Sequence, residues 1–200
     1  MTAIKICGLT REEDVEICDD LGVEYLGLNF IPASPRCITL KQAEKLRTLM
    51  RQSKPVGIFF GEQGEEIDAI ADILHLTYLQ IYDTPHVEPH YVKNRMPIRA
   101  FRTIPDRSTL LYARSRGDLI LLDGPQSGEM PDYTAIKKLP GEIQPSLFLA
   151  GGLKPENVQD AIRSIRPYAV DVASGVESEP GKKSYRKIQA FVSAVRSSLL

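Results

Sequence analysis

Residues 4–10 read Ile-Lys-Ile-Cys-Gly-Leu-Thr and predict a short buried strand that runs directly into a helix. Cys7 and Gly8 stand at the carboxyl end of this strand, and Thr10 precedes Glu13 with the spacing of a capping box. Strand–helix junctions of α/β proteins commonly hold reactive groups, so Cys7 is a candidate catalytic base or nucleophile. The alternative is a structural role, because free cysteines are often packed as small hydrophobic residues.

The same strand–helix unit recurs along the chain. Helical spacing of apolar residues follows most strands, as in Ile67, Ile70, Ala71 and Leu74, and a weaker helix is predicted over 88–95. The predicted strands cover 4–10, 25–30, 55–60, 78–82, 98–102, 118–123, 146–150 and 169–172. Eight such units predict a single (β/α)8 TIM-barrel domain over residues 1–200. A doubly wound open sheet is the alternative, but its usual GxGxxG turn is absent.

The composition is that of an ordinary globular protein with a sizeable core. The 200 residues are 42% hydrophobic and 26% charged, and the net charge of −1 predicts binding neither to nucleic acid nor to an anionic membrane. No signal peptide or membrane span is recognisable. The three cysteines, Cys7, Cys18 and Cys37, form no CxxC, which favours reduced thiols in the cytoplasm and no zinc site.

A barrel of this kind has its active site at the carboxyl ends of the strands, often with a phosphate site in the loops after strands seven and eight. These loops contain Gly151-Gly152 and Ser174-Gly175. Glycine lets backbone N–H groups approach an anion closely, and the helix that follows each loop presents its positive end. The two loops together therefore predict a phosphate site, although glycine can also simply end a strand.

Two charged residues are further candidates. Asp123 ends the sixth strand, where it either caps a loop or acts as an acid at the barrel mouth. Arg36 follows two loop prolines and is either a solvated charge or a fork for a substrate carboxylate. Asp171 lies inside the eighth strand and is interpreted as structural or as a neighbour of the site.

Five motifs together resemble the phosphoribosylanthranilate isomerase family. They are KICGLT at 5–10, SPR at 34–36, LLD at 121–123, LAGGLKPENV at 149–158 and DVASGVE at 171–177. The resemblance implies a TIM barrel of tryptophan biosynthesis. It also implies the conversion of N-(5-phosphoribosyl)anthranilate to the 1-deoxyribulose 5-phosphate product by an Amadori rearrangement, without metal or organic cofactor. The partner is a small phosphorylated substrate, and the chain is expected to be a monomer or a homodimer.

The resemblance also assigns roles to residues by motif. Cys7 resembles the general base and Asp123 the general acid, and Arg36 resembles the residue that pairs with the anthranilate carboxylate. The remaining substrate-binding positions are Gly151, Gly152, Ser174 and Gly175 at the phosphate, together with Gln80. Asp123 must carry its proton at working pH, which requires a raised pKa, while helix amino termini at the barrel mouth can lower the pKa of Cys7.

Two loops depart from the family pattern. The fourth strand ends Gln80-Ile81-Tyr82-Asp83, where the family usually has Gln-Leu-His-Gly, so Tyr82 replaces a histidine. The loop at 126–131 keeps one glycine and gains a proline, where the family has a glycine-rich segment. These changes bear on loop movement and phosphate affinity more than on the type of reaction.

Two other functions are compatible with the pattern. A related sugar-phosphate isomerase of histidine biosynthesis, or an enzyme serving both pathways, would have aspartates at the ends of the first and fifth strands, where this chain has Cys7 and Arg102-Thr103. A degenerate barrel could bind a phosphorylated ligand without turnover, but it would have no need of both Cys7 and Asp123.

Overall fold

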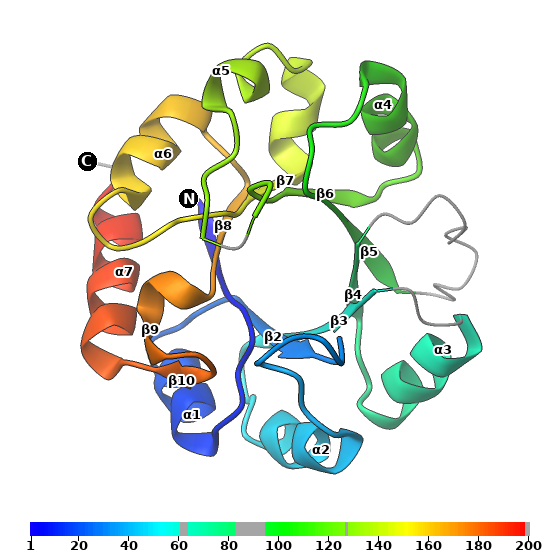
Figure 1. The fold of residues 1–200 in the computed structure, drawn as a ribbon, viewed down its shortest axis with the longest axis vertical. Coiled ribbons are helices and arrows are strands. Elements are labelled where there is room, and N and C mark those ends of the chain that lie inside the picture. Colours follow the sequence, from blue (N-terminus) through cyan, green and yellow to red (C-terminus); the bar gives the residue numbers. More distant parts are fainter. Residues whose placement is uncertain (61–63, 83–94, 127, 199–200) are drawn as a thin grey trace.

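Eight parallel strands close into a barrel in the computed structural model, which describes residues 1–60, 64–82, 95–126 and 128–198. The strands are β1 (Ala3–Ile6), β2 (Tyr25–Asn29), β3 (Lys54–Phe59), β4 (Tyr78–Tyr82), β5 (Met96–Phe101), β6 (Leu119–Leu122), β7 (Leu147–Leu149) and β8 (Ala169–Val172). Helices surround the ring of strands (Figure 1). The predicted (β/α)8 barrel is confirmed, and the open sheet is excluded because β1 pairs with β8.

The helices follow the strands on the outside of the barrel. They are α1 (Glu12–Asp20), α2 (Leu40–Thr48), α3 (Gly64–Ile73), α4 (Arg107–Ser115), α5 (Tyr133–Ile136), α6 (Val158–Ile165) and α7 (Tyr185–Ser197), with 3₁₀ helices at Gly141–Ser146 and Ser174–Val176. The helix predicted over 88–95 lies almost wholly outside the described residues. Within the described part of the chain, no helix has the length and apolar character needed to cross a membrane.

An antiparallel hairpin that the sequence pattern did not predict lies between β8 and α7. It consists of β9 (Glu177–Glu179) and β10 (Lys182–Lys183). In Figure 1 the hairpin lies close to α1 and to the start of α7. It is too short to show an alternating pattern, so only the three-dimensional structure reveals it.

The predicted capping box at the start of α1 is wrong. Arg11 occupies the N-cap position in an extended conformation, and no side chain caps the helix. Thr10 instead donates its hydroxyl hydrogen to the carbonyl oxygen of Gly181 in the hairpin. A tertiary partner has therefore replaced the local one, whereas the box predicted at Thr39 and Gln42 is present at the start of α2.

The barrel wall is built by alternation along each strand. In β6 the side chains of Ile120 and Leu122 pack outward in the layer beneath the helices, while Leu121 packs in the barrel interior. Tyr25 and Phe148 are among the larger side chains that fill the interior. Strands buried on both faces are nearly all apolar for this reason, and the residues that follow their carboxyl ends are left to form the site.

Candidate active site

A cavity of about 330 Å³ opens at the carboxyl ends of the strands. Its lining includes most of the predicted site residues and brings together loops that follow six different strands. Among the residues that line it are Cys7, Arg36, Tyr82, Asp123, Gly151, Gly152, Asp171 and Ser174. The barrel mouth therefore brings together the predicted residues Cys7, Arg36, Asp123, Gly151, Gly152 and Ser174, but not Gln80 or Gly175.

Cys7 follows β1 directly and lines the cavity, where it is partly exposed. Its backbone N–H donates to the carbonyl oxygen of Val172, which fixes the strand end next to β8. Burial raises the pKa of the thiol, and the ammonium groups of Lys5 and Lys183 only partly oppose this effect. The net shift of the thiol pKa is therefore upward, opposite to the lowering expected from the helix amino termini at the barrel mouth.

Asp123 comes directly after β6 and faces the same cavity. Its Oδ1 accepts a hydrogen bond from the Gly124 N–H at 2.8 Å, and its Oδ2 accepts one from the Tyr82 hydroxyl at 3.1 Å. Burial raises the pKa of this carboxyl, and the negative charge of Asp171 raises it further. The direction is the one that a general acid needs, because the carboxyl keeps its proton to higher pH.

A buried ion pair lies beneath these two groups. Lys5 in β1 is fully buried, and its Nζ donates to Oδ2 of Asp171 in β8 at 2.9 Å. Burial lowers the pKa of Lys5, but attraction to the nearby acidic groups, Asp171 foremost, outweighs it and the net shift is upward. Oδ1 of Asp171 has no hydrogen-bond partner among the described residues, although Asp171 lines the cavity. Of the two interpretations of Asp171, structural or a neighbour of the site, its place on the cavity wall agrees with the second.

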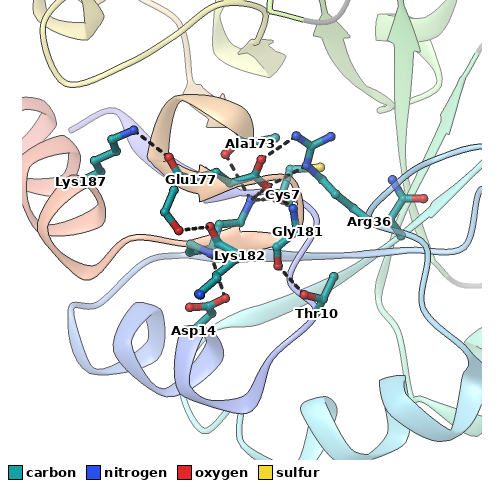
Figure 2. Close-up of polar contacts among 12 residues, drawn as sticks. Cys7, Thr10, Asp14, Arg36, Ala173, Glu177, Gly181, Lys182 and Lys187 are labelled. Carbon is teal, nitrogen blue, oxygen red and sulfur yellow. Dashed lines mark hydrogen bonds and ion pairs between the residues drawn. The ribbon is translucent and has the colours of Figure 1, made fainter.

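The Arg36 side chain reaches the cavity but is not free in solvent. Its Nε and Nη2 atoms donate to the two carboxylate oxygens of Glu177 at 2.7 and 2.6 Å (Figure 2). Burial raises the pKa of Glu177, but the hydrogen bonds from Arg36 and the charge of Lys183 outweigh it and the net shift is downward. Sequence reasoning missed Glu177 and Lys183 as parts of the site, since only their distance in space connects them to Arg36.

The predicted phosphate loops lie side by side at the cavity. Gly151, Gly152 and Ser174 line it, whereas Gly175 packs against the neighbouring loop instead. A Cβ on Gly175 would be 1.9 Å from the carbonyl oxygen of Leu153. Only glycine allows this close approach of the two loops, so Gly175 shapes the cavity through loop geometry and does not line it.

Three other points raised by the sequence can be compared with the structure. Gln80 is buried in β4 and is not among the residues that line the cavity, so its role in substrate binding stays a prediction. Tyr82 stands where the family usually has histidine, and it contacts Asp123 directly. Within the described residues, no group of three His, Cys, Asp or Glu side chains could hold a metal ion.

Comparison with known proteins identifies the family. Residues 4–194 match the model of the family described as N-(5'phosphoribosyl)anthranilate (PRA) isomerase. The chain is 36% identical over 212 residues to the N-(5'-phosphoribosyl)anthranilate isomerase of Leptospira borgpetersenii serovar Hardjo-bovis, with 99% of this chain and 96% of the relative covered.

Solved structures agree with this match. A monomeric form of the dimeric phosphoribosylanthranilate isomerase of Thermotoga maritima superposes with a TM-score of 0.85 at 31% identity, covering 98% of this chain and 99% of the other. A phosphoribosylanthranilate isomerase bound to reduced 1-(o-carboxyphenylamino)-1-deoxyribulose 5-phosphate superposes with a TM-score of 0.81 at 30% identity, covering 98% and 100%. The expected resemblance is confirmed, and the chain belongs to the N-(5'-phosphoribosyl)anthranilate isomerase family.

Proposed function

We propose that this chain converts N-(5'-phosphoribosyl)anthranilate to 1-(2-carboxyphenylamino)-1-deoxyribulose 5-phosphate in tryptophan biosynthesis, with Cys7 as general base and Asp123 as general acid. The observation that carries the proposal is the position of these two groups, which face one cavity from the ends of β1 and β6. An Amadori rearrangement needs one proton donor and one proton acceptor near the same sugar, and this cavity offers both.

The reaction follows from the two proton transfers. Asp123 gives its proton to the ring oxygen of the furanose, the ring opens, and a Schiff base forms between the anthranilate nitrogen and C1. Cys7 as thiolate then takes the proton from C2, and the resulting enolamine tautomerises to the amino ketone. The raised pKa of Asp123 supports its role as the donor, while the raised pKa of Cys7 makes the reactive thiolate a minor species.

The substrate is proposed to span the cavity between two anchoring regions. Its phosphate would bind the backbone of Gly151, Gly152 and Ser174, supported by the loop geometry that Gly175 allows. Its anthranilate carboxylate would pair with Arg36, which lines the cavity next to Cys7. Gln80 keeps its predicted contact with substrate as a proposal. These anchors place the sugar between Cys7 and Asp123, where the protons must move.

The two altered loops raise the alternative that the barrel binds its phosphorylated ligand without turning it over. A turnover assay distinguishes this alternative from the proposed isomerase. Purified protein is assayed by the fluorescence decrease as phosphoribosylanthranilate is consumed. We expect turnover in the wild type and a loss of roughly 10²- to 10⁴-fold in kcat for Asp123→Asn, the usual contribution of a positioned acid. Asp118→Asn, a buried aspartate next to the other end of β6, is the matched control and should retain kcat. Near-normal turnover of Asp123→Asn would contradict the mechanism.

A turnover assay with a second substrate distinguishes the proposed function from that of the related isomerase of histidine biosynthesis. That enzyme would act on the sugar-phosphate substrate of the histidine pathway and would have an aspartate at the end of β1, where this chain has Cys7. We expect no turnover of that substrate.

The free thiols of Cys7, Cys18 and Cys37 support the proposed cytoplasmic location. A sedimentation measurement would decide between the proposed monomer and homodimer.

A further inference from the structure

We propose that Glu177 is a positioning residue of this site: it holds the Arg36 guanidinium so that the outer edge of that group faces the substrate carboxylate. The inference rests on the proposed function and deepens it, because it explains how the β9–β10 hairpin sets recognition of the anthranilate end. Glu177 itself does not contact the substrate. It acts through Arg36.

The bond pattern of the guanidinium determines which edge remains available. Glu177 accepts from Nε and from Nη2, so one side of the planar fork is occupied. Nη1 and the second hydrogen of Nη2 form the other edge, and they can bind a second carboxylate in bidentate fashion. Arg36 lines the cavity, its side chain is 14% exposed, and within the described residues its Nη1 makes no hydrogen bond, so we infer that this edge is the one offered to a ligand.

The aliphatic part of the Arg36 side chain also packs closely against the protein, at Gly8. Gly8 has a positive φ of 70°, and a Cβ at this position would be 2.4 Å from Cδ of Arg36. The stem therefore lies directly on the backbone beside Cys7, and only glycine leaves room for it. With the stem against Gly8 and the head against Glu177, the guanidinium has little freedom left to lose when a ligand binds.

Lys183 offsets the negative charge of Glu177, which would otherwise repel a substrate carboxylate bound nearby. Its buried Nζ donates to Oε1 of Glu177 at 2.8 Å, to the carbonyl oxygen of Cys7 at 2.7 Å and to that of Ala173 at 3.2 Å. All three of its N–H donors are thus used. Arg36 and Lys183 together carry two positive charges against one on Glu177, so the group keeps a net charge of +1 toward a substrate carboxylate.

The hairpin that carries Glu177 is itself fixed to the barrel. The Gly181 N–H donates to Oε1 of Glu177 at 3.3 Å, and Nζ of Lys187 in α7 donates to the backbone carbonyl of Glu177 at 2.7 Å. The Lys183 N–H donates to Asp14 of α1 at 3.1 Å, and Thr10 bonds to Gly181. All of these partners belong to the chain itself, and together they fix the hairpin whose Glu177 holds Arg36.

The test compares two ligands that differ only in the group Arg36 would recognise. One is the reduced product analogue with its 2-carboxyphenylamino group, and the other is the matching phenylamino compound without the carboxylate. Binding of both is measured by titration calorimetry. Glu177→Gln keeps the side-chain size and one acceptor oxygen but removes the charge. We expect it to weaken binding of the carboxylate ligand about tenfold, the scale of one charge-assisted hydrogen bond, and to leave the phenylamino ligand unchanged.

Controls separate positioning from loss of structure. Glu179→Gln removes an exposed partner of Lys182 in the same hairpin, and both ligands should bind it as they bind the wild type. If Glu177→Gln fails to fold, Glu177→Asp keeps the charge that Lys183 needs but is too short to hold both Nε and Nη2, and the same carboxylate-selective loss is expected. Circular dichroism verifies the fold of each variant.

The outcomes that would overturn the inference are specific. Equal weakening of both ligands would make Glu177 a structural residue only, and unchanged binding of both would mean that Arg36 is held without it. In the turnover assay, Glu177→Gln should raise KM far more than it lowers kcat, as expected for lost uniform binding. Turnover of the wild type tests the proposed function separately, because the difference between the two ligands is measured whether or not the chain is active.

Discussion

Replacing Tyr82 by phenylalanine tests the chemistry of Asp123 through a single hydrogen bond. The Tyr82 hydroxyl donates to Oδ2 of Asp123, which favours the ionised form of the carboxyl and holds its pKa down against the effect of burial. Tyr82→Phe keeps the ring over which the Arg102 guanidinium lies, 5.2 Å from the centroid, and removes only the donor. The pKa of Asp123 should therefore rise, and the carboxyl should keep its proton to higher pH.

The size of the shift follows from the geometry of the bond. A hydrogen bond to a charged group contributes about 1.5–3 kcal/mol, and the 3.1 Å distance is long for a hydroxyl donor, which favours the lower end of that range. One pKa unit corresponds to about 1.4 kcal/mol, so we expect a rise of about one unit. The Asp171 charge, the Lys5 ammonium and the Gly124 N–H face the same carboxyl in both proteins and should cancel in the comparison.

The measurement is the pH dependence of kcat/KM, which reports the free enzyme. Burial raises the thiol pKa above its ordinary 9.0, so we expect Asp123, which starts from 3.8, to titrate before Cys7. The reactive form, with a protonated carboxyl and a thiolate, is then a minor species. Under that order Asp123 sets the midpoint of the acidic limb and Cys7 that of the alkaline limb, as apparent values of the coupled pair.

In Tyr82→Phe the acidic limb should move up by about one pH unit while the alkaline limb stays in place. The plateau between them should not fall, because a larger fraction of the enzyme is in the reactive form. Tyr78→Phe is the matched control, since Tyr78 lies at the other end of the same strand. An acidic limb that stays in place or moves to lower pH would refute the role of Tyr82, and with it the assignment of that limb to Asp123.

Three further substitutions test other parts of the site. Cys7→Ser should lose roughly 10²- to 10⁴-fold in kcat, because a hydroxyl is a far weaker base at working pH, and stopped assays of turnover measure it. Gly175→Ala forces its Cβ into a backbone carbonyl of the adjacent loop; it should lower stability by about 1–3 kcal/mol and raise KM, whereas Gly141→Ala, with open space around it, should do neither. Lys5→Met leaves the Asp171 carboxylate buried without its partner and should cost about 3–5 kcal/mol in urea unfolding. Adding Asp171→Leu should recover most of that loss, and failure to recover it would show that the pair does more than balance charge.

Local patterns in the sequence determined the barrel and its two central groups. Alternation and helical spacing of apolar residues indicate which side chains are buried. In β6 the four consecutive apolar residues Leu119–Leu122 are enough to predict a buried strand. Cys7 and Asp123 were predicted as site residues because each directly follows a buried strand, and parallel strands bring their carboxyl ends to one face. The family motifs added their roles, which remain proposals, and the match to the family confirmed the resemblance.

Only the tertiary structure decided which partners these groups have. Glu177 follows Arg36 by 141 positions in the sequence, and Gly181 follows Thr10 by 171, so no local pattern could connect either pair. The Thr10 hydroxyl could bond to the first turn of α1 or to the hairpin. It bonds to Gly181 of the hairpin because the hairpin lies beside α1 in the folded chain. The direction of each pKa shift likewise depends on charges from several strands, because electrostatic effects follow distance in space and not order in the chain.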